Sequence, residues 1–388
     1  MNILCLADYF LPGYKAGGPI RTLSNLLEKL GDEFHFAIVT RDRDLGDLTP
    51  YQGIKVDSWQ IIDKAEACYL SPSNHSFRGI RDVILSKKHD VLYLNSFFSP
   101  FFTFKPLLLR RLRLIPDMPV VLAPRGEFSS GALALKRFKK QVYINLSKLI
   151  GLYRNVIWQA SSEYEKKYIR ERFGKDVCIE IAPNFPPTYY TKTGLGLRHK
   201  KNKGRLKTLF LSRISHMKNL DGALKILKGM NAKIQLSIYG PIENKSYWKE
   251  CQLIINQLPD NIDARYSGAV RPEQVASVLM KHDLLFLPTL GENYGQIIVE
   301  AFMAGCPVLI SDRTPWRGLE KKGVGWDLPL EEPEEYQSVL EKCADMNEAA
   351  FSKLVIRAHE YGMKLCMDQD VVERTKEVFC KAFYQKEM

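Results

Sequence analysis

The sequence lacks several features that mark whole classes of protein. Its eight cysteines include no Cys-x-x-Cys pair and its seven histidines show no His-x-x-x-His spacing, so no cysteine or histidine metal site is indicated. Scattered cysteines in a chain of this size predict reduced, buried thiols in a cytosolic protein. No stretch has the roughly 18 uncharged apolar residues that a membrane-spanning helix needs. The N-terminus has no basic segment and Asp8 interrupts its apolar run, which predicts a first strand rather than a signal peptide.

The sequence does have enough apolar residues for two ordinary domains, and a positive charge that is unevenly placed. Its 388 residues are 45% hydrophobic, and this length suits two domains of about 190 residues each. The formal net charge is +12, and residues 105–154 alone hold 11 lysines and arginines against Asp117 and Glu127, a local charge of +9 (11 − 2). Such a segment suits an anionic partner, such as a membrane surface, a nucleic acid or a phosphorylated substrate.

Apolar segments typical of strands alternate with helical patterns along the chain. After the first apolar segment and a helix with regularly spaced leucines, the strand-like segments are residues 34–40, 90–96, 119–126, 206–214, 232–240, 283–289 and 307–312. This alternation predicts parallel sheets covered by helices on both faces. The basic, glycine-rich segment 191–205 interrupts the pattern and predicts a linker.

We therefore predict an α/β protein with two Rossmann-like domains. The expected limits are residues 1–190 for the N-terminal domain, 191–205 for the linker and 206–367 for the C-terminal domain. The helical segment of about 368–388 is expected to pack back on the N-terminal domain. Open sheets of this type bind ligands in the loops at the carboxyl ends of their strands.

Two loops in such positions carry residues suited to phosphate. AGGPIR (16–21) lets a ligand approach the backbone at the start of a helix, although an ordinary glycine turn would look the same. In SRISHMKN (212–219), Arg213 and Lys218 are placed to reach one diphosphate. Two solvated surface cations are the alternative interpretation of that second loop.

A third loop, LGENYG (290–295), lies between a strand-like segment and the helical pattern QIIVEAFMAG (296–305). Backbone N–H groups after Gly295 can meet a phosphate at the start of this helix. Glu300 lies about one and a half turns into the helix, where its carboxylate can reach the two hydroxyls of a ribose. Glu292 lies in the loop, where the group beyond the diphosphate would be. Apolar neighbours predict that Glu300 is buried, and a buried carboxylate needs a partner.

The run PTLGENYGQIIVEAFMAGCPVLISD (288–312) resembles the signature of the retaining glycosyltransferases of family four. That signature has two glutamates with seven residues between them, followed by a pattern that AFMAGCPV is similar to. SRISHMKN resembles the family's phosphate loop, with Ser212 and Asn219 in place of two glycines. AGGPIR stands where the family has a glycine pair, and IAPNF (181–185) is similar to the segment that closes the first domain.

This resemblance implies a GT-B fold, that is, two facing Rossmann-like domains with parallel sheets and an inter-domain cleft. It implies a nucleotide-sugar donor as substrate, retention of the anomeric configuration, no cofactor and no catalytic metal. Arg213 and Lys218 would neutralise the departing diphosphate, and Glu292 would bind hydroxyls of the transferred sugar; these three are the implied catalytic residues. The implied donor-binding residues are Gly17, Gly18, Arg213, Lys218, Glu292, Asn293, Tyr294, Gly295, Gln296 and Glu300.

Two loops of the first half need a separate interpretation. Many family members have a histidine at the end of a first-domain strand, whereas the comparable loop here, APRGEFSSG, offers Arg125 and Glu127 as candidates for binding the acceptor. Asp42 and Asp44 in RDRDLGD have the Asp-x-Asp spacing that binds metal in the other glycosyltransferase fold. The two-half layout argues against that fold, so we expect a solvated loop there.

The basic segment also holds apolar residues at helical spacing. This pattern is typical of a helix lying on anionic lipid, although a domain helix with a basic outer face would show it too. No nucleic-acid recognition motif accompanies the charge. The apolar residues are Leu135, Phe138, Val142, Leu146 and Leu149, and the cations beside them are Lys136, Arg137, Lys139 and Lys140.

The sequence thus predicts a hexosyltransferase that uses a UDP- or GDP-sugar and a saccharide acceptor, with a polyprenyl-diphosphate-linked acceptor as one form. The expected process is assembly of bacterial O-antigen, capsule or exopolysaccharide. The expected place is the cytoplasm or the inner face of the cytoplasmic membrane. Two alternatives stay open: a GT-B nucleotide-sugar epimerase, and a non-catalytic nucleotide-sugar binding module.

Overall fold

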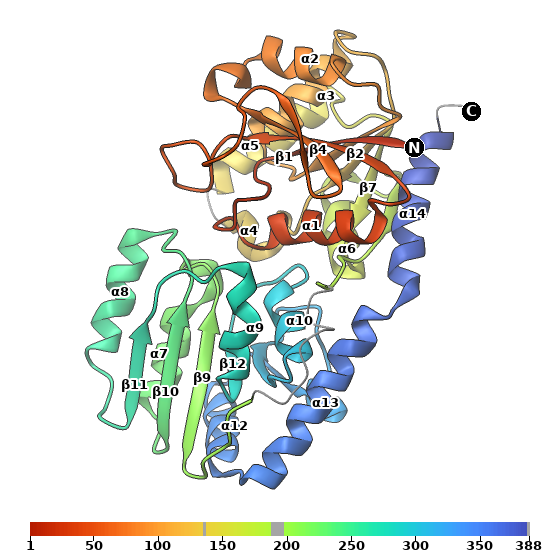
Figure 1. Ribbon diagram of the computed structural model, residues 1–388. Helices are drawn as coiled ribbons and strands as arrows, with labels where there is room; N and C mark the ends of the chain where they lie inside the picture. The colour runs from red at the N-terminus through yellow and green to blue at the C-terminus, as the bar shows by residue number, and fades with distance from the viewer. Residues whose placement is uncertain (135–136, 188–197, 386–388) are drawn as a thin grey trace. The chain divides into compact units, whose positions relative to one another are not determined.

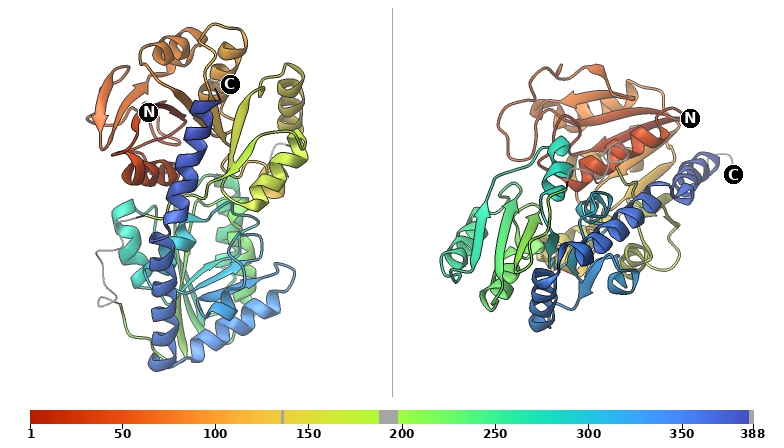
Figure 2. Two further views of the ribbon diagram at one scale, coloured as in Figure 1. Left: turned by 90° about the vertical axis from the view of Figure 1, so that its right-hand side faces the viewer. Right: turned by 60° about the horizontal axis from the view of Figure 1, so that its bottom comes forward.

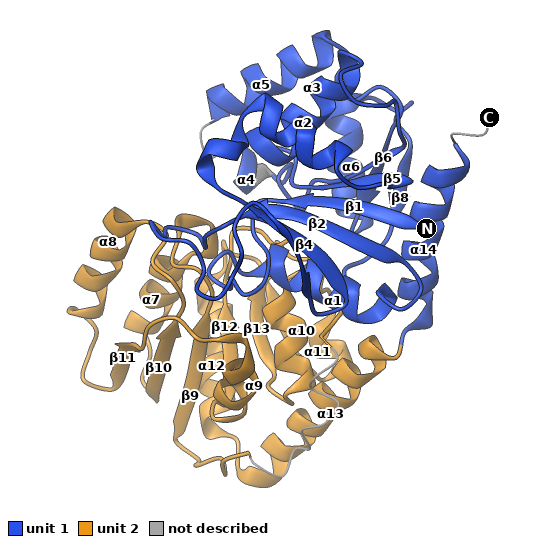
Figure 3. Ribbon diagram, turned by 45° about the horizontal axis from the view of Figure 1, so that its top comes forward, with its two compact units in different colours: residues 1–185, 368–388 blue, residues 186–367 orange. Residues whose placement is uncertain are grey.

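The computed structural model describes residues 1–134, 137–187 and 198–385, and the chain divides into two compact units (Figures 1 and 3). Unit 1 comprises Met1–Phe185 and Asp368–Met388, and unit 2 comprises Pro186–Met367. Each unit is built on one sheet with helices packed against it (Figure 2).

The sheet of unit 1 has eight strands in the order β3-β4-β2-β1-β5-β6-β7-β8. All neighbouring pairs are parallel except β3 with β4 at one edge. Its central strands are mostly apolar and buried because helices cover both faces. The strands are β1 (Asn2–Ala7), β2 (His35–Arg41), β3 (Trp59–Ile62), β4 (Ala65–Leu70), β5 (Val91–Asn95), β6 (Val120–Ala123), β7 (Val156–Ala160) and β8 (Ile179–Ile181).

The helices of unit 1 form a layer on each face of this sheet. Residues of α1 and α14 pack with β1, β2 and β5 in one buried cluster, and residues of α2, α3, α5 and α6 pack in a second cluster. Phe379 of α14 contacts the rings of Phe34, Phe36 and Tyr93, so the C-terminal helix belongs to unit 1. The helical segments are α1 (Gly18–Leu30), η1 (Pro72–His75), α2 (Phe77–Leu85), η2 (Pro100–Phe104), α3 (Lys105–Arg111), α4 (Ser130–Ala134), α5 (Arg137–Leu149), α6 (Glu163–Phe173) and α14 (Gln369–Tyr384).

The sheet of unit 2 has six strands, all parallel, in the order β11-β10-β9-β12-β13-β14. Numbered within the unit, this order is 3-2-1-4-5-6, which is that of a Rossmann sheet. The order reverses between β9 and β12, so the loops that follow these two strands flank the switch point. The strands are β9 (Arg205–Leu211), β10 (Lys233–Tyr239), β11 (Ile262–Tyr266), β12 (Leu284–Leu287), β13 (Val308–Ser311) and β14 (Gly325–Leu328).

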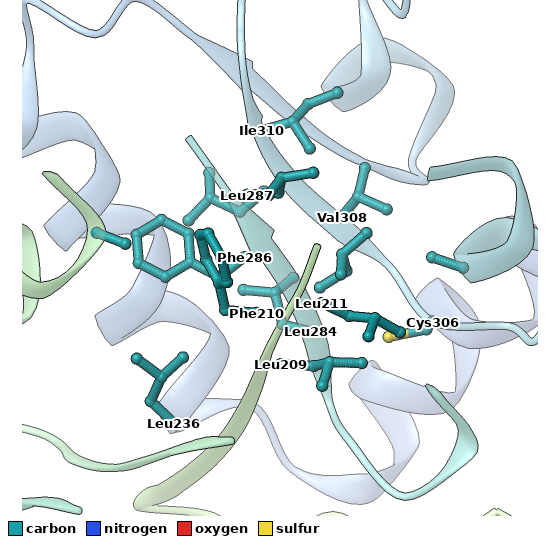
Figure 4. Close-up of a cluster of buried hydrophobic side chains, with 14 of the residues drawn as sticks. Leu209, Phe210, Leu211, Leu236, Leu284, Phe286, Leu287, Cys306, Val308 and Ile310 are labelled. Atoms are coloured by element: carbon teal, nitrogen blue, oxygen red, sulfur yellow. The ribbon is translucent and has the colours of Figure 1, made fainter. Parts of the chain in front are cut away.

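The core of unit 2 consists of apolar side chains from these strands and from the helices on both faces. Figure 4 shows side chains of β9, β12 and β13 packed together around Phe210 and Phe286, both fully buried. Helix α10 contacts α9 and α13, and helix α7 contacts α8 and α12. The helical segments are η5 (His216–Lys218), α7 (Leu220–Lys228), α8 (Lys245–Ile255), α9 (Pro272–Met280), α10 (Gln296–Met303), α11 (Leu319–Lys322), α12 (Pro333–Asp345) and α13 (Glu348–Cys366).

The predicted linker, residues 191–205, lies partly outside the described residues. Its described part is held by hydrogen bonds. Arg198 Nη2 donates to the carbonyl of His282 at 2.6 Å, and the buried Lys201 donates through Nζ to the carbonyl of Ala344 at 3.3 Å. This part of the segment is therefore anchored on unit 2. The reason is that its cations find backbone carbonyls, which a composition argument does not reveal.

The structure confirms the predicted α/β class with two Rossmann-like sheets. Five of the eight cysteines are buried, namely Cys5, Cys68, Cys251, Cys306 and Cys343. Across residues 1–134, 137–187 and 198–385, no helix has the length and apolar character needed to cross a membrane.

Candidate functional site

The loops after β9 and β12 are joined to each other by hydrogen bonds. The carbonyl of Met217 accepts from Thr289 Oγ1 at 2.9 Å and from the N–H of Leu290 at 2.9 Å. Asn219 Nδ2 donates to the carbonyl of Pro288 at 2.8 Å. The two loops at the switch point therefore form one structural element, which is where an open α/β sheet binds its ligand.

Asn219, in the loop after β9, stands where the family's phosphate loop has a glycine. Its φ is 58°, in the left-handed region, where glycine is favoured and asparagine is the commonest substitute. The same residue begins α7, and its side chain makes the bond to the loop after β12. The replacement thus preserves the backbone and adds a link between the two loops.

Lys218 and Glu292 form an ion pair through Lys218 Nζ and Glu292 Oε1. Each side chain is only 13% exposed, so the pair is largely screened from water. The backbone N–H of Glu292 donates to the carbonyl of Arg313 at 3.0 Å, which fixes the loop behind the carboxylate. The structure thus brings together two residues that the sequence places 74 positions apart.

Arg213 has a different partner in this structure. Its Nη1 lies 3.0 Å from Glu243 Oε2, and both side chains of this pair are more than a third exposed. Exposed ion pairs contribute about 0–1 kcal/mol, so the guanidinium is easily recruited by a stronger anion. His216, in the same loop, is exposed and packs against Tyr247, with 4.2 Å between ring centroids.

Gly295 starts α10 with a left-handed backbone, φ 76°. A Cβ at this position would lie 2.8 Å from Ile298 Cδ1, so both the backbone angle and the packing favour glycine. The preceding residue is held by Trp316, whose Nε1 donates to the carbonyl of Tyr294. Asn293 and Tyr294 are partly exposed, beside the first-turn N–H groups that an α-helix leaves without intrahelical partners.

Gln296 and Glu300 lie on the buried side of α10, 8% and 4% exposed. The burial predicted for Glu300 is confirmed. A carboxylate at this depth is stable only with polar partners, and it lies in the second turn of the helix whose N-terminus carries the positive end of the dipole. Both side chains are therefore packed in the interior next to the switch-point loops.

In unit 1, the AGGPIR loop begins α1 directly after the loop that follows β1. Gly17 has φ 71° and Gly18 opens the helix, and a Cβ on either would meet no atom within 4 Å. The space around both glycines is therefore open, as close approach of a ligand to the backbone requires.

The loop that carries Asp42 and Asp44 is not the solvated loop that we expected. The two side chains are 1% and 4% exposed. Asp44 accepts from the N–H groups of Tyr14 and Lys15 at 2.7 and 3.0 Å, and Asp42 forms a two-point ion pair with Arg43. The expectation was wrong because the Asp44 carboxylate binds backbone N–H groups of the loop before α1 and the Asp42 carboxylate is paired with Arg43. No group of three or more potential metal ligands occurs in the described part of the chain.

Arg125 and Glu127 each take part in a network inside unit 1. Arg125 donates to Asn184 Oδ1 at 2.6 Å, to Tyr93 Oη at 2.5 Å and twice to Asn95 Oδ1. Its guanidinium thus connects β5 with the segment that closes the unit, and its role toward an acceptor stays a prediction.

The Glu127 carboxylate accepts from Ser96 Oγ at 2.8 Å and from the N–H groups of Phe97 and Phe98 at 2.5 and 3.0 Å. Burial raises the pKa of Glu127 to about 7, although these hydrogen bonds act in the opposite direction. A carboxyl group that changes charge near neutral pH therefore lies at the carboxyl end of β5.

Residues 197–351 match the family described as glycosyl transferases group 1. A Klebsiella pneumoniae protein, described as an uncharacterized 41.2 kDa protein in the cps region, is 24% identical over 256 residues, which cover 63% of this chain and 66% of that protein, just under two thirds of its length. Sucrose-phosphate synthase from Thermosynechococcus elongatus has a similar structure, with a TM-score of 0.72, 14% identity and 99% of each chain covered.

Anabaena Alr3699/HepE in complex with UDP and glucose has a TM-score of 0.69 and 16% identity, with 98% of this chain and all of that chain covered. At these identities, the structural likeness shows the fold. Because the family match lies within unit 2 and the structural likeness extends over both units, this chain has the GT-B fold, and its residues 197–351 match the glycosyl transferases group 1 model.

Proposed function

We propose that this protein is a retaining glycosyltransferase that moves a sugar from a nucleoside-diphosphate sugar to a saccharide acceptor during assembly of a bacterial surface polysaccharide. The observation that carries the proposal is the Lys218–Glu292 pair beside the start of α10, at the switch point of the unit that matches the family. A cation, a carboxylate and a helix N-terminus together suit a diphosphate that is attached to a sugar.

The donor diphosphate binds between the loop after β9 and the start of α10. Lys218 and Arg213 supply positive charge, and the first-turn N–H groups of α10, next to Asn293, Tyr294 and Gln296, supply hydrogen bonds and the helix dipole. Glu300 accepts from the ribose hydroxyls. Within unit 1, the open space around Gly17 and Gly18 admits the close approach of a phosphate to the backbone.

The chemical step transfers the sugar while negative charge develops on the departing diphosphate. Lys218 and Arg213 stabilise that charge, and stabilisation of charge that grows in the transition state accelerates the reaction. Glu292 holds hydroxyls of the transferred sugar and so orients its anomeric carbon. In this proposal the side-chain cations and the N-terminus of α10 neutralise the charge of the diphosphate, and no resident metal or cofactor is assigned.

Two of the similar proteins support the choice of substrates. HepE is described in complex with UDP and glucose, which supports a UDP-sugar donor, and the Klebsiella relative is described from a cps region, which supports a polysaccharide acceptor.

The exposed face of α5 supports an acceptor held at a lipid surface. Phe138 and Leu149 are 81% and 82% exposed, and Val142 and Leu146 continue the apolar stripe between them. Arg137, Lys139 and Lys148 are exposed on the same helix, and Arg111 at the end of α3 donates to the carbonyl of Ile150 at 3.1 Å. Leu135 and Lys136 of the predicted pattern lie outside the described residues. A continuous exposed apolar stripe beside cations suits the interface of an anionic membrane, so we place the protein at the inner face of the cytoplasmic membrane.

The test of the proposed reaction is to follow slow donor hydrolysis, with water as the acceptor, by proton NMR. Wild-type protein is incubated with UDP-glucose, UDP-galactose and GDP-mannose, and the first anomer of the released sugar is recorded. Retention predicts that an α-linked donor first gives the α-sugar, that Glu292→Gln loses this release, and that Glu243→Gln keeps it.

Three other results would contradict the proposal. Release of the β-sugar first would show inversion. Conversion of the donor into an epimer would show a nucleotide-sugar epimerase, and donor binding without turnover, even with added polysaccharide acceptors, would show a binding module.

A further inference from the structure

A cavity of about 490 Å³ lies within unit 1, apart from the residues assigned to the donor. Arg41 at the end of β2, Ser76 after β4 and Lys105 after β5 contribute to its lining, together with Arg43, His75 and Phe101. It therefore lies at the carboxyl ends of parallel strands, the edge at which open α/β sheets bind ligands. Its volume falls within the range of small-molecule sites, about 300–1,000 Å³, and is far more than a bare ion needs.

The Phe101 ring organises the nitrogen-bearing side chains of this cavity. The guanidinium carbon of Arg41 lies 5.1 Å from the ring centroid, and Lys105 Nζ lies 4.8 Å from it. The His75 ring packs on the same aromatic ring, with 4.8 Å between centroids. Cation–π contacts of this kind hold charged groups in place before a ligand arrives.

The charge and hydrogen-bonding state of the lining favour an anion. Of the three lining cations, Arg41 pairs with Asp8 at 2.8 Å and Arg43 pairs with Asp42 at 2.7 Å, whereas Lys105 has no carboxylate partner among the described residues. His75 is 8% exposed, and its buried Nε2 has no hydrogen-bond partner among the described residues. Burial lowers the pKa of His75, and the nearby Arg41 acts in the same direction. An unsatisfied buried nitrogen among cations is stabilised by an acceptor oxygen.

We propose that this cavity binds the acceptor through a negatively charged group, a carboxylate or a phosphate carried by a saccharide. The inference rests on the proposed function: unit 2 holds the donor, so a second cavity of this size at the sheet edge of unit 1 serves the second substrate. Lys105 supplies the charge, Arg41 and His75 supply hydrogen-bonding nitrogens, and the remaining volume accommodates sugar rings. Recognition of charge selects an acidic or phosphorylated saccharide over a neutral one.

Ser76 allows a test that leaves the fold intact. Its hydroxyl caps α2 by accepting from the N–H of Gly79 at 3.0 Å, and aspartate and asparagine are equally good caps. Ser76→Asp therefore adds a negative charge to the cavity wall without removing the cap, and Ser76→Asn is the matched neutral control. Lys105→Gln removes one cation, and Lys88→Gln removes an exposed lysine elsewhere in unit 1.

The experiment measures dissociation constants by calorimetry for glucuronate, glucose 6-phosphate, glucose and glycerol 3-phosphate, at low ionic strength. We expect glucuronate and glucose 6-phosphate to bind at least tenfold more tightly than glucose. Ser76→Asp and Lys105→Gln should each weaken that binding about tenfold, and Ser76→Asn and Lys88→Gln should leave it unchanged. Should Lys105→Gln not fold, the contrast between Ser76→Asp and Ser76→Asn decides alone.

Equal binding of glucose and glucuronate would overturn the recognition of charge. If glycerol 3-phosphate bound as tightly as glucose 6-phosphate, the proposal that the ligand is a saccharide would be overturned, and the result would point to a lipid headgroup or free phosphate. No difference between Ser76→Asp and Ser76→Asn would overturn the placement of the site. UDP binding is measured on the same variants, and because the donor residues lie elsewhere it should not change. If wild-type protein did not bind UDP, the proposed function would be refuted. If wild-type protein bound UDP but not the anionic saccharides, only this inference would be refuted.

Discussion

The ion pair between Lys218 and Glu292 makes a specific prediction about donor binding. If Lys218 contacts the diphosphate, the donor competes with Glu292 for the same ammonium group. Glu292→Gln keeps the shape of the side chain and removes its charge, so Lys218 is left without its ionic partner in the ligand-free protein. UDP, which has no sugar, then binds without displacing or opposing a carboxylate.

The magnitude follows from the burial of the pair. Exposed pairs contribute about 0–1 kcal/mol and breaking a buried pair costs about 3–5 kcal/mol, so a pair whose side chains are 13% exposed lies between these ranges. We expect Glu292→Gln to lower the free energy of unfolding of the ligand-free protein by about 2 kcal/mol. We expect it to tighten UDP binding about tenfold, which corresponds to about 1.4 kcal/mol. Binding of UDP-glucose should improve less than that of UDP, because Glu292 also contacts the sugar.

The assay combines urea unfolding with calorimetric titration of UDP and UDP-glucose. Glu243→Gln is the matched control, because it removes the same charge from the exposed pair with Arg213 and should change stability by less than about 0.5 kcal/mol. The double variant Lys218→Met with Glu292→Gln completes a cycle that isolates the pair. Weaker UDP binding by Glu292→Gln, or unchanged binding together with unchanged stability, would refute the placement of the diphosphate at Lys218.

Two further predictions concern unit 1. The pKa of Glu127 is about 7 in the folded protein, against an ordinary value of 4.5. Folding therefore favours the protonated carboxyl, and stability is lost as pH rises through this window. Between pH 4.5 and pH 8, the free energy of unfolding of wild-type protein should fall by about 3 kcal/mol more than that of Glu127→Gln. Parallel pH profiles of urea unfolding for the two proteins would contradict the raised pKa. For the α5 stripe, Phe138→Ser with Leu149→Ser should lower partitioning to phosphatidylglycerol vesicles at least tenfold, whereas Leu253→Ser, at an exposed position of α8 in unit 2, should not. Vesicle binding that depends neither on lipid charge nor on the α5 stripe would contradict the proposal that this helix binds an anionic membrane.

The sequence allowed prediction of the features that depend on local pattern. Alternating apolar segments predicted two parallel sheets, and Gly295 correctly marked the start of α10. Apolar neighbours correctly predicted the burial of Glu300. These features were accessible because periodicity and glycine conformation are properties of short segments.

Features that depend on contacts between distant segments could not be predicted in this way. Asp44 is charged and lies in a loop, yet it is buried because it accepts from N–H groups 30 residues earlier. The antiparallel strand β3 and the cavity around Phe101 likewise arise from segments that are brought together only by the fold. The Asn219 link between the two switch-point loops had one local signal, an asparagine in place of a family glycine, and its partner became visible only in the structure.

The central claim is that the switch-point loops of unit 2 bind a nucleoside diphosphate with its ribose at Glu300. The most direct measurement is thermal unfolding of wild-type protein and Glu300→Gln with UDP, GDP, ADP and CDP. We predict that one nucleotide, UDP, stabilises wild-type protein by about 2.7 kcal/mol at one hundred times its dissociation constant, and that this stabilisation is largely lost in Glu300→Gln at the same nucleotide concentration. Equal stabilisation of the two proteins, or no stabilisation of wild-type protein by any of the four nucleotides, would contradict the claim.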